Sequence, residues 1–162
     1  MRTSILSATA ICVLCGVSTW GQSKHSQVGT WNLDIGQSTF GSEPVPKSIT
    51  VWILKDTPQL LSWRVREVHG DGKAFAYSWS GPEDGAMHPV MHNGKGIGKQ
   101  SATREDDGAL DRHGEDPDGT VFDARDKLSD DGNTILEEVT EKSKDGKETK
   151  TKTMWQRTRK HT

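Results

Sequence analysis

Apolar and polar residues alternate with a period of two along most of the chain after residue 28. Between residues 48 and 54, for example, Ile49, Val51 and Ile53 alternate with a second set of side chains. This period is typical of β-strands that bury one face. No stretch shows the longer period of an extended amphipathic helix, so the pattern predicts an all-β chain.

Asp-Gly pairs separate the alternating runs, and they suit tight hairpins because both residues accept positive φ. From residue 107 onward such turn signals recur roughly every 10 to 14 residues, which indicates an antiparallel meander. We expect eight or nine strands, at Gly29–Asp34, Ser48–Leu54, Gln59–Val68, Ala74–Ser80, Ile97–Arg104, Ala109–Gly114, Thr120–Leu128, Thr134–Glu141 and Lys147–Arg157.

Polar residues fall at several positions that are expected to face inward, among them Glu67, Gln100 and Asp123. A sandwich core would bury each of them at a cost of several kcal/mol if it stayed unpaired. A barrel with a hydrated interior avoids this cost, and closure also removes exposed strand edges. We therefore expect an antiparallel up-and-down barrel of about eight strands, with an open sandwich as the alternative.

The N-terminus has the pattern of an export signal. Arg2 precedes an uncharged apolar run over residues 5–17, which is short for a membrane span. We expect a signal peptide at 1–21, a short tail at 22–27, the barrel domain at 28–158 and a C-terminal tail at 159–162. An uncleaved anchor is the alternative. The expected location is periplasmic or secreted, with no membrane span after cleavage.

The cysteine content and the distribution of charged residues limit which bonds and partners the mature chain is expected to form. Both cysteines lie within the apolar run, so the mature chain would hold no disulfide. The 21 Lys and Arg residues are interspersed with 23 Asp and Glu residues, without the basic patch that nucleic-acid binding needs. Nucleic acid is therefore not an expected partner, and the oligomeric state stays open.

The residues Gly-Thr-Trp-Asn-Leu-Asp at 29–34, Ser-Thr-Phe-Gly at 38–41 and Pro-Lys-Ser at 46–48 resemble the start of a group of uncharacterised exported bacterial proteins. Those proteins carry a Gly-Thr-Trp-Lys-Leu-Asn motif and are expected to be lipocalin-like barrels. The resemblance extends over residues 28–157 through the order of the later Asp-Gly turns. It implies a lipocalin-like fold and carries no ligand or activity.

The Gly-x-Trp spacing at Gly29 and Trp31 also resembles the first strand of true lipocalins. In that family the Trp closes one end of the barrel and packs against an Arg of the last strand. The resemblance implies this structural role for Trp31, with Arg157 or Arg159 as its partner.

Aromatic residues on three consecutive expected strands form the most suggestive group of side chains. They are either the core of a domain poor in aliphatic residues or the wall of a cavity for a small apolar or aromatic ligand. The hypothetical ligand-binding residues are Trp52, Trp63, Tyr77 and Trp79, with Arg64, Arg66 and Gln100 as polar contacts.

No catalytic or metal-binding signature stands out. His88 and His92 are four residues apart, but Pro89 lies between them and glycines follow, which indicates a loop. The acidic residues at 116–119 and 130–133 are typical of hairpin turns. We expect no catalytic residue, metal or cofactor. Three functions stay open: a ligand-binding barrel, an envelope-associated interaction domain without a pocket, and a hydrolase or isomerase with a site at the barrel mouth.

Overall fold

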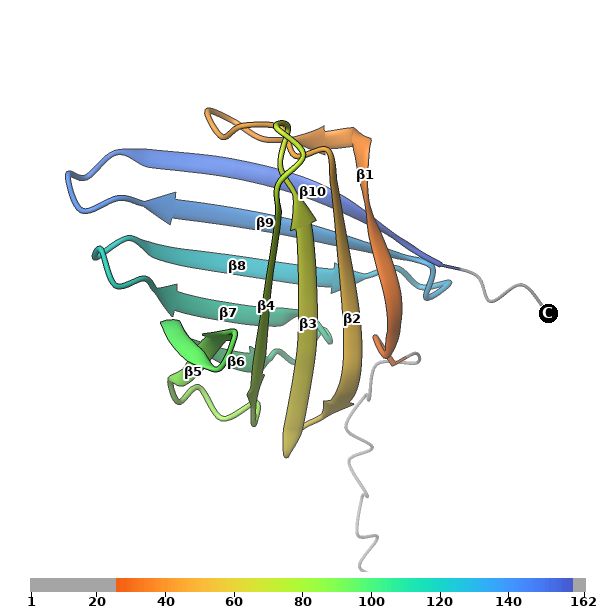
Figure 1. Ribbon diagram of the computed structural model, residues 1–162. Helices are drawn as coiled ribbons and strands as arrows, with labels where there is room; N and C mark the ends of the chain where they lie inside the picture. Colours follow the sequence, from red (N-terminus) through yellow and green to blue (C-terminus); the bar gives the residue numbers. More distant parts are fainter. Residues whose placement is uncertain (1–25, 159–162) are drawn as a thin grey trace, which may run out of the picture.

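The computed structural model describes residues 26–158, which form one closed antiparallel barrel (Figure 1). Each strand pairs with its neighbours in sequence, and β1 pairs with β10 to close the sheet. The described residues include no helix that is long and apolar enough to cross a membrane. The strands are β1 (Gly29–Thr39), β2 (Ser48–Thr57), β3 (Leu60–Val68), β4 (Ala74–Gly81), β5 (His88–His92), β6 (Lys95–Arg104), β7 (Leu110–Glu115), β8 (Val121–Leu128), β9 (Thr134–Lys142) and β10 (Glu148–Arg157).

The barrel has ten strands, so the expectation of about eight was wrong. The additional strand is β5, which lies in the segment interpreted as a loop because of its proline and flanking glycines. It pairs with β4 through only two residue pairs, and its register with β6 shifts between Val90 and Met91. This side of β5 is close to a free edge, where a proline such as Pro89 is tolerated.

The two ends of the barrel differ. One end, which we call the open end, carries the connections at 40–47, 69–73, 93–94, 116–120 and 143–147. The other, which we call the closed end, carries the start of β1 and the end of β10, together with the remaining turns. In Figure 1 strands β2, β3 and β4 pass in front of β7 to β10, so the interior lies between these two groups.

The best-buried side chains lie toward the closed end. Trp31, Leu61 and Trp79 are almost inaccessible to solvent. Trp79 stacks on Trp63 with 4.5 Å between ring centroids, and its indole nitrogen donates to the backbone oxygen of Gln100 at 3.0 Å. The core therefore fills one end of the barrel only.

The seam between β1 and β10 brings Trp31 opposite Arg157. The Arg157 Cζ lies 4.2 Å from the Trp31 ring centroid, which is the contact that the Gly-x-Trp resemblance implies. The Arg157 guanidinium also donates to three backbone oxygens, those of Ser26, Val28 and Gly132, at 2.6–2.8 Å. One side chain thus joins the two ends of the described chain.

A buried ion pair network closes the same end. The Arg104 Nη2 lies 2.6 Å from Asp56 and 2.5 Å from Glu83, and both carboxylate side chains are less than a tenth exposed. Asp56 also accepts a hydrogen bond from the Gln27 backbone nitrogen at 2.7 Å. These contacts fix the segment before β1 across the barrel end.

The expected signal peptide at 1–21 lies outside the described residues, as do most of the 22–27 tail, the 159–162 tail and Arg159.

Candidate ligand cavity

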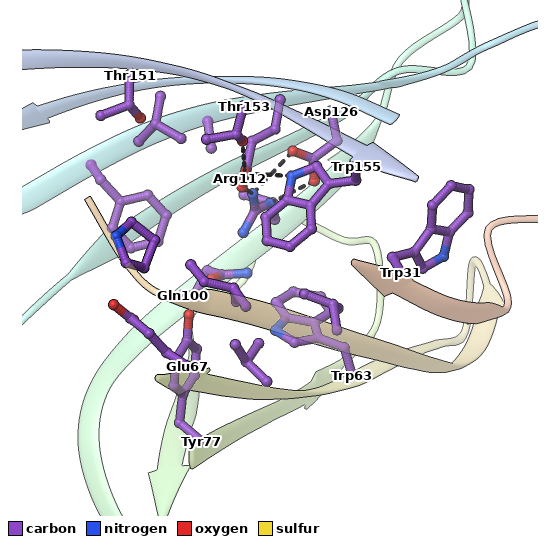
Figure 2. Close-up of a pocket in the computed structure, with 18 of the residues that line it drawn as sticks. Trp31, Trp63, Glu67, Tyr77, Gln100, Arg112, Asp126, Thr151, Thr153 and Trp155 are labelled. Atoms are coloured by element: carbon purple, nitrogen blue, oxygen red, sulfur yellow. Dashed lines mark hydrogen bonds and ion pairs between the residues drawn. The ribbon is translucent and has the colours of Figure 1, made fainter. Parts of the chain in front are cut away.

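A cavity of about 620 Å³ extends from the core at the closed end to the loops of the open end (Figure 2). Its wall is largely aromatic and aliphatic. Every second residue of β2, β3, β4, β8, β9 and β10 contributes, which follows from the alternation of inward and outward side chains along a strand. The aromatic lining residues are Trp31, Phe40, Trp63, Phe75, Tyr77, Phe122 and Trp155.

Three charged side chains form an interior ion cluster, which we define as Arg112, Asp126 and Glu137. The Arg112 Nε lies 2.8 Å from Asp126 Oδ2, and its Nη2 donates to Asp126 Oδ1 at 3.0 Å and to Glu137 Oε1. The strands β7, β8 and β9 supply one residue each, and Asp126 pairs directly with Glu137 across β8 and β9. Figure 2 shows Arg112 and Asp126 beside Trp155 and above Trp63 and Tyr77.

The second oxygen of Glu137 is also occupied. It accepts hydrogen bonds from Thr153 Oγ1 at 2.6 Å and from the Trp155 indole nitrogen at 2.9 Å. The guanidinium carbon of Arg112 lies 5.7 Å from the Trp63 ring centroid, within the range of a cation–π contact. The aromatic wall and the ion cluster are therefore one connected arrangement.

The interior ion cluster holds one positive charge and two carboxylates, and the pKa values reflect this excess. Burial raises the pKa of Asp126 to about 6; Glu137 adds to the rise and Arg112 opposes it. Burial alone would lower the pKa of Arg112, but its two carboxylate partners raise it. Burial and the charge of Glu137 raise the pKa of Tyr77 to about 12, so its hydroxyl stays protonated at neutral pH.

Gln100 projects into the same space from β6 (Figure 2). Its side chain is 4% exposed, and its amide nitrogen has no hydrogen-bond partner among the described residues. A buried polar group of this kind is normally completed by water or by a ligand.

The open end of the cavity is acidic. We define the acidic mouth as Glu43, Glu67, Asp116 and Glu141, which all line the cavity. Glu67 lies 3.4 Å from His69, whereas no ion pair forms at the other three within residues 26–158. Burial raises the pKa of Glu141, and Glu43 and Asp116 add to that rise.

Of the seven residues hypothesised to bind a ligand, three line the cavity. Trp63, Tyr77 and Gln100 do so, as Figure 2 shows. Trp79 is 2% exposed and stacks on Trp63, so it belongs to the core.

The other three hypothesised residues, Trp52, Arg64 and Arg66, lie on the outer face of the barrel. They alternate with the inward residues of β2 and β3, and Trp52 pairs with Arg64 across these strands. Their placement as cavity contacts was therefore wrong. It assumed that both faces of these strands could reach one ligand, whereas neighbouring residues point to opposite sides.

Of the three polar residues expected to face inward, Glu67 and Gln100 do so. Asp123 does not, because Phe122 and Ala124 on either side of it occupy the inner face of β8. Asp123 instead lies outside, where its carboxylate is 2.7 Å from His113 Nδ1.

The sequence analysis did not single out Arg112 and Asp126. The signal was present, since Asp126 shares the alternation of Phe122, Ala124 and Leu128, and Glu137 shares that of its own strand. Two buried carboxylates, Asp126 and Glu137, require a positively charged partner, and Arg112 provides it from the inner face of β7.

His92 does not face a metal site. Its Nδ1 contacts the Ala76 backbone oxygen at 2.5 Å, and its ring stacks on Phe75 with 4.5 Å between centroids. Within the described residues, no group of three His, Cys, Asp or Glu side chains is arranged to hold a metal ion.

No family model matches the chain, and the search of curated proteins finds no match. The argument about function therefore rests on the barrel and its cavity.

Proposed function

We propose that this chain is an exported, lipocalin-like barrel that binds a small ligand with an apolar or aromatic body inside its cavity. The observation that carries the proposal is the cavity itself. Its volume of about 620 Å³ falls within the roughly 300–1,000 Å³ of small-molecule sites. Such sites combine a mostly apolar wall with a few converging polar groups, and here Gln100 and Tyr77 have that position.

The alternative of an interaction domain without a pocket assumed a filled interior, which the cavity does not support. The enzyme alternative draws only on the raised pKa of Asp126. Burial beside Glu137 accounts for that shift, and Arg112 engages both carboxylates. Ligand binding is therefore the function that the geometry favours.

Native mass spectrometry of the purified protein, before and after organic extraction, tests the proposal. We expect a reproducible additional mass that extraction removes. The variant Val139→Trp fills the cavity from β9 and should carry no such mass. The matched control Glu138→Trp places the same side chain on the exposed outer face of that strand and should retain it. Equal loading of both variants would contradict the proposal.

Two parts of this proposal, that the chain is exported and that it is lipocalin-like, rest on the sequence alone. N-terminal sequencing of the protein recovered from a bacterial periplasm tests the first, with cleavage expected after Gly21 or Gln22.

A further inference from the structure

The charges of the cavity wall are strongly unbalanced. Among the lining side chains of the described chain, Arg112 is the one arginine or lysine. The lining carboxylates are Glu43, Glu67, Asp116, Asp126, Glu137 and Glu141.

Arg112 does not compensate for the acidic mouth, because its guanidinium is already held by Asp126 and Glu137. The interior ion cluster itself keeps an excess of negative charge. Where a ligand would pass, the described lining of the open end therefore holds no arginine or lysine, and its basic side chain, His69, lies 3.4 Å from Glu67.

The aromatic residues near the open end also favour a positively charged ligand. Phe75 and Tyr77 lie with their ring centroids 5.9 Å apart, and Phe40 and Phe122 also line this region. The face of an aromatic ring attracts a cation, and quaternary ammonium groups are bound between such rings in proteins.

An independent observation points to a hydrogen-bond acceptor inside the cavity, supplied by water or by a ligand. The Gln100 amide is buried in the cavity wall with its nitrogen unpartnered. No residue of the acidic mouth and no aromatic ring accepts a hydrogen bond from the Gln100 amide nitrogen.

We propose that the ligand is an organic cation, an amine or quaternary ammonium compound with an apolar body, whose charge lies at the acidic mouth while its body packs along Trp63 and Tyr77. This inference rests on the proposed function and adds the charge class of the ligand. It also implies that carboxylate-bearing lipids are rejected, because the interior arginine is neutralised and the mouth repels them.

Three probes with the same twelve-carbon chain separate the effect of charge from that of apolar packing. They are dodecyltrimethylammonium, dodecanol and dodecanoate, titrated at pH 7.5 below the micelle concentrations of the two ionic probes and below the solubility limit of dodecanol. Binding is measured by calorimetry and by the intrinsic tryptophan fluorescence, to which Trp63 and Trp155 on the cavity wall contribute. We expect the ammonium probe to bind at least tenfold more tightly than dodecanol, and dodecanoate to bind more weakly than either.

The double variant Asp116→Asn with Glu141→Gln removes two charges of the acidic mouth that make no ion pair with residues 26–158. It should weaken the ammonium probe at least fivefold and leave dodecanol unchanged. The control Glu138→Gln removes a carboxylate from the outer face of β9, where it pairs with Lys152, and should change neither.

The outcomes separate the two proposals. If dodecanol binds as tightly as the ammonium probe, or dodecanoate binds best, the charge inference is overturned while the binding function stands. If the double variant and the control behave alike, the role of the acidic mouth is overturned. If no probe binds to the extracted protein, both proposals fail.

Discussion

Replacing Arg112 by Met should strongly destabilise the barrel. The substitution leaves Asp126 and Glu137 facing each other with no cation between them. For each lost ion pair, the Coulomb attraction at about 4 Å between charge centres is about 4 kcal/mol at an effective dielectric constant near 20. Two effects offset part of this loss: Asp126 can become protonated, and folding no longer removes a guanidinium from water. We therefore expect a net loss of about 3–5 kcal/mol.

Equilibrium unfolding in urea, followed by tryptophan fluorescence at pH 7.5, measures this loss. The control is Arg125→Met on the neighbouring strand. Arg125 also contacts two carboxylates, those of Asp107 and Asp111, but it is 43% exposed, against 14% for Arg112. An exposed pair contributes little, so this variant should lose at most about 1 kcal/mol.

Because a domain of this size is stable by only about 5–15 kcal/mol, Arg112→Met could leave much of the protein unfolded. A second variant, Arg112→Met with Asp126→Leu, keeps the test informative, since it removes one of the two unpaired charges. It should regain at least about 1 kcal/mol relative to the single variant. Equal losses for Arg112→Met and Arg125→Met would refute the reasoning, because burial would then make no difference.

Three further predictions concern other parts of the barrel. Because the pKa of Asp126 rises from 3.8 to about 6 on folding, its contribution to the free energy of unfolding grows as the pH falls from about 7 to 4. Urea unfolding at several pH values should therefore show that the unfolding free energy of the wild type rises by about 2–3 kcal/mol more than that of Asp126→Asn between pH 7 and pH 4; parallel curves would contradict it. In Gly114→Ala the new Cβ would lie 2.1 Å from the Phe122 ring. That ring must move toward the cavity, and thermal unfolding should show a loss of about 1–3 kcal/mol, with weaker ligand binding; an unchanged melting temperature would show that the ring is free to move. Arg157→Met removes three hydrogen bonds and the stacking on Trp31, and urea unfolding should show a loss of about 2–4 kcal/mol; a loss below 1 kcal/mol would mean that water replaces these contacts.

The alternation of apolar residues predicts most of the sheet, because one face of nearly every strand is buried. It fails at β5, where the short segment His88–His92 holds a proline and pairs with β4 over two residues only. Pairing with the neighbouring strands β4 and β6 stabilises such a strand, and its own β-propensity contributes little. The end of β1 was also missed, because its register against β10 shifts after Asp34.

The cavity was less predictable than the sheet. Alternation indicates which face of a strand points inward, and this places Trp63, Tyr77 and Gln100 correctly. It does not show which inward residues of distant strands meet. The contact of Arg112 with Asp126 and Glu137 depends on the register of three strands at once, which turn residues alone do not determine.

The closed barrel has a consequence for how the chain folds. Nine of its ten strand pairings join sequence neighbours and can form hairpin by hairpin, while the pairing of β1 with β10 joins opposite ends of the domain. Closing that long loop is entropically costly, so we expect the seam to form last. Substitutions of Arg157 should then accelerate unfolding and hardly slow folding. At the same seam Arg157 bonds the backbone of Ser26, so the two ends of the described residues meet. The barrel is therefore a suitable scaffold for circular permutation, with new termini at any hairpin of the open end.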